Sequence, residues 1–346
     1  MLIAGGDVSL SRGCGKKILD DPSYDPFTGL AAWIAPADVA FANLESQLFD
    51  NRGEMQSPDN LLIFCGPPGA ARVVGRAGFD VVSTANNHAW DYGRQALFDT
   101  MTHLEQQGVA YAGTSRAPRE QYEPVVLRRR GYSIALFAVT DIWNQGPLAS
   151  HPARDYVAGG ELEELLPRIR RARAEHDVVL VSYHGGSEYI DMPVQATRNF
   201  VSAVMRSGVD AVVGHHPHVP HGVGWFEGRP AFYSLGNLVF AMHRDYKWTG
   251  MSFLARLTFA SDEAGRKARL ERVEACPYQI VGHRPVRFEA AGSEALERAF
   301  RRHLAHLSIT VGGSRIGEAN PDGCLPLEPP DAARARFVAT REGRPR

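Results

Sequence analysis

The sequence predicts an α/β protein, a sandwich built around a mixed sheet. Short apolar runs typical of buried strands alternate with segments of helical periodicity as far as about Gly214, and mostly strands follow. No internal repeat, low-complexity block or shift in composition marks a domain boundary. We therefore expect one large domain over residues 1–310 and not two independent ones.

The composition is ordinary for a globular protein. The 346 residues are 44% hydrophobic and 22% charged, and 38 basic against 39 acidic residues give a net charge of -1. No excess of either sign points to nucleic acid or to anionic lipid as a partner. No apolar run is long enough to span a membrane, and no signal region precedes the first strand, so we expect a cytoplasmic location. Nothing in the composition indicates an oligomeric state.

The four cysteines are widely separated in the sequence. Cys14, Cys65, Cys276 and Cys324 form no C-x-x-C pair, so they define neither a zinc knuckle nor a disulfide framework. We expect them to be mostly free thiols in a reducing compartment.

The first two predicted strands are each followed by polar side chains. Leu2–Ala4 leads into Asp7, and the strand that begins at Val39 ends in Asn43 and Glu45. A carboxylate just after a strand of an α/β sheet lies where ligands usually bind, although Asp7 is also a candidate helix or turn cap. Asn43 and Glu45 point to the same side of an extended chain, because side chains alternate with period two.

The third strand repeats this pattern. Asp80–Thr84 follows a predicted helix over Ala70–Arg76 and leads into Asn87 and His88, with Asp91 three residues later. Asn and His at such a junction are also common turn formers. In a functional site, His88 would act as a general acid or base, and Asp91 would orient its imidazole.

The central part of the chain continues the alternation of helices and strands. Periodicity predicts a short helix over Phe27–Ile34 and longer helices over Tyr92–Gln107, Glu161–Glu175 and Pro193–Ser207. A strand is predicted over Val109–Ala112, and a hairpin is formed by Pro124–Arg129 and Tyr132–Thr140 with its turn at Gly131. The continuous apolar run Asp177–His184 is typical of a strand buried on both faces. It would bring His184 to the edge of the same cleft.

Three histidines follow the next apolar run. The run stops at Gly214 and is followed by His215, His216, Pro217 and His218. One such histidine is more often a packing residue, but neutral imidazole is the commonest metal ligand, and a cluster at a strand end favours a metal site. The glycine frees the backbone there and the proline stiffens it.

Strands dominate the remainder. The sequence predicts a hairpin of Gly222–Phe226 and Pro230–Phe240. Two antiparallel strands over Met251–Phe259 and Ala268–Ala275 follow, and then a helix over Ser293–His306. Gly, Pro and Arg dominate from Gly312, so we expect residues 311–346 to form a loosely packed C-terminal extension.

A mixture of carboxylate, amide and imidazole groups suits a divalent ion. Mn, Fe or Zn is favoured, with Ca and Mg as alternatives, over a structural zinc held by thiolates. Up to two ions about 3.5–4 Å apart would let a carboxylate bridge them, activate a water and polarise a scissile group.

Six motifs, in order between Leu2 and Phe240, resemble a known family. They are Gly6-Asp7, Ala42–Glu45, Ala85–Gly93, Tyr183–Gly186, Gly214–Val219 and Tyr233–Asn237. The ordered set resembles the CapA family of poly-gamma-glutamate capsule synthesis proteins, a branch of the calcineurin-like metallophosphoesterases. The resemblance implies a calcineurin-like four-layer α/β sandwich with mixed central sheets and a dinuclear metal site.

The resemblance also implies the roles of individual residues. It makes metal ligands of Asp7, Glu45, Asn87, His184, His216 and His218. His88 takes the acid/base role beside Asp91, and we expect Asn43, His215 and Asn237 to contact the substrate or to support the ligands. The sequence departs from the wider superfamily in two motifs, since Ser9 replaces the histidine of Asp-x-His and Asn43-Leu44-Glu45 replaces Gly-Asp-x-x-Asp. We also expect no N-terminal anchor of the kind that the capsule proteins carry.

These residues favour a divalent-metal-dependent hydrolase that acts on a phosphoester, or on a gamma-glutamyl or peptide amide, through a metal-activated water. Two alternatives stay open: a metal-assisted epimerase or transferase on a peptide substrate, and a non-catalytic component of poly-gamma-glutamate biosynthesis. Retention of both His88 and Asp91 favours catalysis over the scaffold. The expected partner is a small-molecule, peptide or poly-glutamate substrate.

Overall fold

Two β-sheets form the framework of the protein, which is described here from a computed structural model over residues 1–241, 246–261 and 268–330. The first sheet contains β1 (Leu2–Val8), β2 (Val39–Leu44), β5 (Val81–Ser83), β6 (Ala110–Ala112), β13 (Asn237–Val239), β14 (Met251–Ser261), β15 (Ala268–Val281), β16 (Arg284–Arg287), β17 (Arg315–Ile316) and β18 (Leu325–Glu328). The second contains β7 (Val125–Arg129), β8 (Tyr132–Thr140), β9 (Val178–His184), β10 (Ala211–His215), β11 (Val223–Phe226) and β12 (Arg229–Phe232). A separate pair is formed by β3 (Gln47–Leu48) and β4 (Cys65–Gly66).

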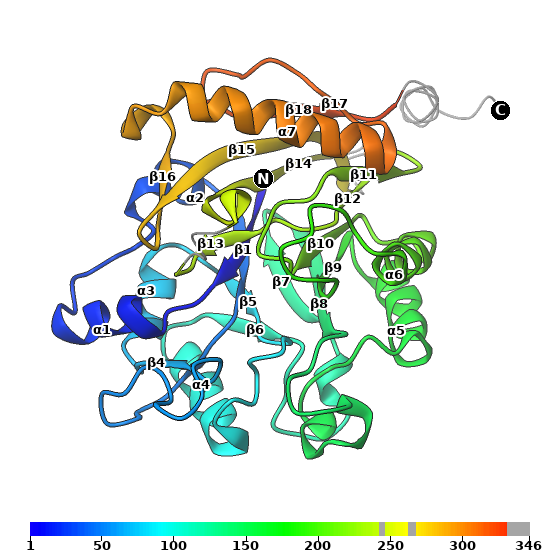
Figure 1. Ribbon diagram of the computed structural model, residues 1–346. Coiled ribbons are helices and arrows are strands. Elements are labelled where there is room, and N and C mark those ends of the chain that lie inside the picture. The colour runs from blue at the N-terminus through cyan, green and yellow to red at the C-terminus, as the bar shows by residue number, and fades with distance from the viewer. Residues whose placement is uncertain (242–245, 262–267, 331–346) are drawn as a thin grey trace.

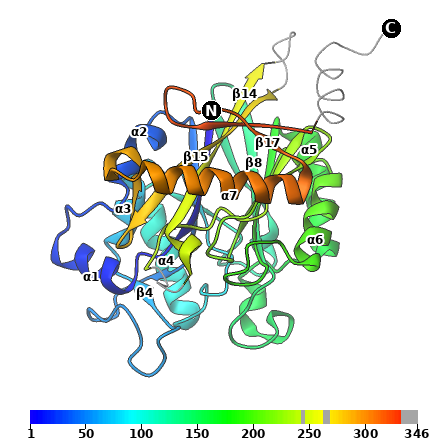
Figure 2. The same cartoon turned by 45° about the horizontal axis from the view of Figure 1, so that its top comes forward.

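Helices cover the outer faces of both sheets. The α-helices are α1 (Arg12–Asp20), α2 (Ala31–Ile34), α3 (Ala70–Arg76), α4 (Gly93–Gln106), α5 (Leu162–Glu175), α6 (Gln195–Arg206) and α7 (Glu294–Gly312). Single 3-10 turns occur at Thr28–Leu30, Glu120–Tyr122, Leu148–Ser150, Pro152–Asp155, Lys247–Gly250 and Glu289–Ala291. In Figure 1, α5 and α6 lie outside the second sheet, and Figure 2 shows α7 crossing over β14 and β15.

Both sheets are mixed. In the first sheet β1 runs parallel to β2 and antiparallel to β14, and in the second β8 runs antiparallel to β7 and parallel to β9. Layers of helix, sheet, sheet and helix follow from this packing, so the predicted four-layer α/β sandwich with mixed central sheets is confirmed.

Alternation of apolar side chains along the strands builds the layers. On β1, Leu2 and Ala4 face the core between the two sheets, while Ile3 packs with the outer helices. On β9, Leu180 faces the central core, and Val181 packs beneath α5 and α6. Each fully buried Leu, Ile or Val side chain contributes about 1.5–3 kcal/mol to folding. Continuous apolar runs are therefore needed where both faces of a strand are covered.

The predicted hairpin arm Pro230–Phe240 is wrong as a single strand. Its first part is β12 in the second sheet, but the chain then turns at Gly236, where φ is 60°, and β13 joins the first sheet parallel to β1. The arm could not be divided from the sequence, because its apolar character is the same on both sides of the turn.

Residues beyond α7 pack onto the first sheet. β18 pairs with β15, and Cys324 forms a disulfide with Cys276 across a Cα–Cα distance of 4.1 Å. The buried Arg256 guanidinium bonds both carboxylate oxygens of Glu274 at 2.9 and 3.0 Å and reaches Asp322 at 2.9 Å. The expected loose packing from residue 311 is therefore wrong as far as β18, and residues 331–346 lie outside the described residues.

The same disulfide corrects the prediction for the cysteines. Mostly free thiols were expected, but only Cys14 and Cys65 are free among the described residues, and both are buried. The pairing partners lie 48 positions apart in sequence, so their spacing gave no indication of it.

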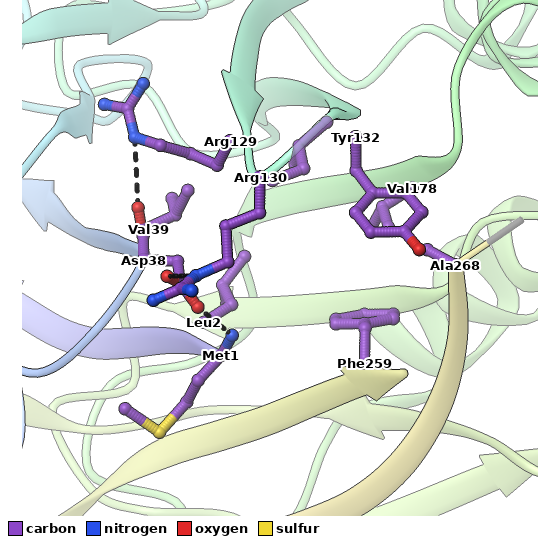
Figure 3. Close-up of a pocket in the computed structure, with 11 residues that line it drawn as sticks. Met1, Leu2, Asp38, Val39, Arg129, Arg130, Tyr132, Val178, Phe259 and Ala268 are labelled. Atoms are coloured by element: carbon purple, nitrogen blue, oxygen red, sulfur yellow. Dashed lines mark hydrogen bonds and ion pairs between the residues drawn. The ribbon is translucent and has the colours of Figure 1, made fainter. Parts of the chain in front are cut away.

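A largely apolar cavity of about 110 Å³ opens at the amino ends of β1, β2 and β9 (Figure 3). Tyr132 and Phe259 lie on one side of it, and Arg130 lies on the other, where its Nε donates to Asp38. This edge of the sheets is opposite to the one that carries the predicted site.

No described helix has the length and apolarity needed to cross a membrane.

Candidate metal centre

The carboxyl ends of strands from both sheets meet at one edge and bring all eleven predicted site residues together. They are Asp7, Asn43, Glu45, Asn87, His88, Asp91, His184, His215, His216, His218 and Asn237. Strand register explains part of this convergence. Asp7 on β1 lies level with Asn43 on β2 and with Asn237 on β13, and His184 on β9 lies level with His215 on β10.

Two glycines allow the chain between β12 and β13 to pass close to β1 and β10. A Cβ atom at Gly6 would lie 2.0 Å from the carbonyl oxygen of Gly236, and one at Gly214 would lie 2.1 Å from that of Tyr233. Since real Cβ atoms do not tolerate such distances, any side chain at either position would force the backbone of β1 or β10 away.

Asn43 links three of the candidate groups. Its Nδ2 atom lies 2.8 Å from Asp7 Oδ1, 3.3 Å from Glu45 Oε2 and 3.2 Å from His184 Nδ1. Its Oδ1 accepts a bond from Asn86 Nδ2 at 3.1 Å, so the amide cannot easily turn. Asn43 thus holds two carboxylates and an imidazole in place.

Glu45 lies at the centre of the cluster. Its carboxylate belongs to two groups of potential ligand atoms that lie within 4.8 Å of one another, the first with His184 and His216 and the second with Asp7 and His218. Its Oε1 atom is buried without a hydrogen-bond partner and lies 3.7 Å from His218 Nε2. This is the position that a carboxylate shared by two cations would occupy.

The two buried carboxyl groups differ in their affinity for protons. Burial alone would raise the pKa of Asp7, but contacts with His215 and His218 outweigh burial and hold it well below its ordinary value. Burial, with the charge of Asp7 as a second cause, raises the pKa of Glu45 well above its ordinary value. Two carboxylates in one buried site both ionise only where nearby positive charge offsets their repulsion.

The histidines show the same division. Burial, reinforced by neighbouring histidines, lowers the pKa of His184 well below its ordinary value and that of His216 to about 3. Burial opposes the charge on His218 too, but its contact with Asp7 raises the pKa overall. Neutral His184 and His216 are in the form that binds metals.

The backbone of the histidine loop adopts the left-handed region twice. His216 has a φ of 97° and His218 a φ of 57°, and neither is glycine. His216 N donates to Asp7 Oδ2 at 3.1 Å, and His218 Nδ1 lies 2.9 Å from Asn237 Oδ1. Such conformations cost about 1–3 kcal/mol each and concentrate at functional sites.

Asn87 and His88 follow β5 in the first sheet. Asn87 Oδ1 lies 2.8 Å from His184 Nε2, while its Nδ2 donates to Asn144 Oδ1 at 3.2 Å. His88 Nδ1 lies 2.8 Å from Asp91 Oδ2, and His88 Nε2 lies 4.0 Å from Glu45 Oε1. With Nδ1 donating to an ionised Asp91, the neutral ring would keep the lone pair of Nε2 free.

Several neighbours of the site were not predicted from the sequence. Gln47 holds the His88–Asp91 turn through bonds to the backbone of Ala89, Gly93 and Tyr92. Phe64 lies 4.1 Å from the His88 ring, measured between centroids, and its backbone N–H donates to Asp91 Oδ2 at 3.1 Å. These contacts join distant segments, and no local pattern in the sequence indicates them.

The donor set fits divalent cations. Glu45 Oε1, His216 Nδ1 and both ring nitrogens of His215 are buried without a hydrogen-bond partner. A buried polar atom without a partner costs about 1–3 kcal/mol, which coordination would remove for the groups that bind the ion. His215 Nδ1 lies 3.4 Å from Asp7 Oδ1, behind that carboxylate, which fits a supporting role.

An α/β sandwich with carboxylate, amide and imidazole groups converging at its strand ends defines a protein with a candidate centre for divalent metal ions. Residues 1–242 match the family model described as "Bacterial capsule synthesis protein PGA_cap". The chain belongs to this family.

Curated relatives agree with this assignment. The chain is 33% identical over 245 residues to the PGA biosynthesis protein CapA of Bacillus subtilis, with 70% of this chain and 63% of that protein covered. It is 28% identical over 250 residues to the capsule biosynthesis protein CapA of Bacillus anthracis, covering 70% and 59%. A probable polyglutamine synthesis accessory protein of Mycobacterium tuberculosis is 25% identical over 267 residues, covering 72% and 67%. The chain thus spans under two thirds of the two Bacillus proteins.

Similar solved structures include two nucleotidases. A putative 5'-nucleotidase from Staphylococcus aureus has 14% identity and a TM-score of 0.47, with 81% of this chain and 54% of that chain covered. A 5'-nucleotidase from Candida albicans has 10% identity and a TM-score of 0.47, covering 88% and 58%.

Proposed function

We propose that this protein is a divalent-metal-dependent hydrolase that acts on a phosphoester or on a gamma-glutamyl or peptide amide. The observation that carries the proposal is the position of Glu45, which belongs to both groups of potential ligands. Two ions held there would supply Lewis-acid polarisation of the scissile group and a nucleophile at neutral pH. Asp7, Glu45, Asn87, His184, His216 and His218 would hold them.

His88 would transfer the proton. Its Nε2 lone pair faces Glu45 Oε1 across 4.0 Å, and its Nδ1 is held by Asp91. In the hydrolysis, Nε2 would take a proton from the attacking water or return one to the leaving group, and Asp91 would stabilise the imidazolium. Phe64 and the Gln47 contacts keep the ring in position throughout.

The site supports both substrate classes equally. Phosphoester and amide hydrolysis both place negative charge on oxygen in the transition state, and the same cations stabilise it. The name of the Bacillus subtilis relative, a PGA biosynthesis protein, favours a gamma-glutamyl polymer as substrate or partner for this chain.

A metal analysis combined with an assay panel tests the proposal. We expect protein that is purified without chelators to carry up to two divalent ions per chain. Glu45→Gln should lose metal and turnover together on any phosphoester or gamma-glutamyl substrate that the wild type hydrolyses. Glu175→Gln, at the exposed end of α5, is the matched control and should change neither. Folded, active wild-type protein without metal would contradict the proposal.

A non-catalytic role in poly-gamma-glutamate biosynthesis is a second candidate. It is favoured by the name of the Mycobacterium tuberculosis relative, an accessory protein. Metal binding without turnover on the whole panel would favour this role. Proton exchange at a substrate carbon, measured in deuterated water, would instead favour the epimerase.

The disulfide bears on the cytoplasmic location predicted from the sequence. The bond between Cys276 and Cys324 argues against it, because disulfides are rare in reducing compartments.

A further inference from the structure

A cavity of about 160 Å³ adjoins the candidate metal centre. His218 and Asn237 form the wall that it shares with the centre, and the rest of its lining is provided by Arg12, Leu62, Tyr189, Phe240, Ala241 and Thr249. Arg12 is the one lysine or arginine among the described residues that line it. A substrate whose reacting bond lies at the metal centre would extend into this cavity.

The Arg12 side chain is held over the cavity by two contacts. Its guanidinium carbon lies 4.3 Å from the centroid of the Phe64 ring, and Nη2 donates to the carbonyl oxygen of Leu61 at 2.9 Å. The Nε atom is buried and has no hydrogen-bond partner. No ion pair with a carboxylate neutralises Arg12 in the described part of the chain. The guanidinium is thus positioned but retains donor capacity.

Backbone conformation supports the same conclusion. Eight described residues other than glycine have positive φ angles, and four of them line the metal centre or the cavity: Arg12 (50°), Tyr189 (60°), His216 (97°) and His218 (57°). Strained residues of this kind persist where the surrounding structure fixes them, and they cluster at ligand sites. The left-handed backbone conformation is sterically unfavourable for a residue with a side chain, so the surrounding structure must hold Arg12 in it.

We propose that Arg12 binds an oxyanion substituent of the substrate, a carboxylate or a phosphate, in the cavity beside His218. A planar guanidinium with free N–H groups recognises such oxyanions through two parallel hydrogen bonds. The aromatic walls formed by Tyr189 and Phe240 would contact the apolar atoms that join this substituent to the reacting bond. This inference rests on the proposed function and narrows it to substrates that carry a second anionic group.

Binding measurements on the full chain test the inference without relying on turnover. The probes are inorganic phosphate, gamma-glutamylglutamate and a derivative of that dipeptide in which amides replace the carboxylates. Calorimetric titrations would compare the wild type with Arg12→Gln, Arg12→Lys and the control Arg52→Gln, an exposed arginine. Metal content and thermal unfolding are measured on the same preparations.

Arg12→Gln should weaken binding of an anionic probe by at least ~10-fold, because a hydrogen bond to a charged group contributes about 1.5–3 kcal/mol. The affinity of Arg12→Lys for these probes should lie between those of the wild type and Arg12→Gln. Lysine keeps the positive charge but lacks the planar guanidinium that makes two parallel hydrogen bonds. Binding of the amide derivative should not change in Arg12→Gln, and Arg52→Gln should match the wild type with every probe.

The two probes separate the two sources of the oxyanion. A loss confined to phosphate supports a phosphoryl group, and a loss confined to the dipeptide supports a carboxylate. The inference is overturned if folded Arg12→Gln binds both anionic probes as the wild type does, or if the wild type binds neither. Wild-type protein that holds no metal would defeat the proposed function alone, and the same titrations on that metal-free protein would still decide the role of Arg12.

Discussion

The Nδ1 atom of His88 lies 2.8 Å from Oδ2 of Asp91, three residues further along the chain. Asp91 also accepts a hydrogen bond from the backbone N–H of Phe64, which holds the carboxylate in the position where it contacts the imidazole. The second ring nitrogen is left to face Glu45 and the candidate metal centre. A fixed imidazole with one free nitrogen is the arrangement expected of a proton-transfer group.

His88→Ala should therefore retain metal and fold yet lose roughly 10²–10⁴-fold in turnover, the usual contribution of a positioned acid or base. Asp91→Asn should show a smaller loss, because the ring stays but its orientation and tautomer are less well fixed. Rate, metal content and thermal stability are measured on the same preparations. Near wild-type turnover in His88→Ala would remove its catalytic role, and a loss of metal would make it a ligand.

Replacing His216 or His218 with alanine should lower metal affinity by at least ~10-fold, since loss of a ligand costs no less than loss of a group that orients one. Metal affinity is measured by competition with a chelator of known affinity. His103→Ala, in the last turn of α4, is the matched control and should bind metal like the wild type. Unchanged metal affinity in both variants would show that these histidines pack in the fold and do not bind metal.

The disulfide should stabilise the protein strongly. The bonded cysteines are 48 positions apart. Closing a loop of that length lowers the entropy of the unfolded chain, which raises its free energy by about 4 kcal/mol at 25 °C. Cys276→Ser should lower the free energy of unfolding by that order. Denatured protein should show two reactive thiols before reduction and four after it, because Cys14 and Cys65 are free. Four thiols before reduction would contradict the pairing.

Asp38 should contribute to stability in a manner that depends on pH. A hydrogen bond from Arg130, followed by one from the Met1 amino group, lowers the pKa of Asp38 in the folded state (Figure 3). A lowered folded pKa means that the contribution is complete above the ordinary value of 3.8 and is lost as the pH falls through the lower folded value.

Asp38→Asn should therefore cost at most about 1 kcal/mol at pH 7, as expected for a partly exposed pair, and the difference from wild type should shrink below pH 4. Urea unfolding at pH 7, 5 and 3 measures it. A difference that stays constant over this range would show that the charge of Asp38 is not responsible.

Much of the fold was accessible from the sequence, since burial on both faces of a strand requires an apolar run and leaves a clear signal. Helix α3 has the predicted bounds, and Asp7, Glu45 and His184 were found because each follows such a run. Their convergence was accessible too, because strand ends of an α/β sheet meet at one edge. The metal-binding and catalytic roles of these residues are still predictions.

The features that could not be predicted from the sequence depend on contacts between distant segments. The packing of Arg12 on Phe64 joins residues 52 positions apart, and the Cys276–Cys324 bond joins neighbours in space through β15 and β18. No local period records such contacts. The division of Pro230–Phe240 between two sheets was missed for the same reason, since strand pairing partners are chosen by the tertiary fold.

The passage of the chain from β12 to β13 makes the candidate metal centre a seam between the two sheets. Asp7, Glu45 and Asn237 come from the first sheet, whereas His184 and the histidine loop come from the second. A cation bound across this seam would be lost whenever the sheets separate, so occupancy and cohesion of the two halves would be thermodynamically linked. At a free metal concentration 100 times the dissociation constant, that linkage would add about 2.7 kcal/mol per site against unfolding. Chelation would therefore loosen the whole sandwich as well as the site.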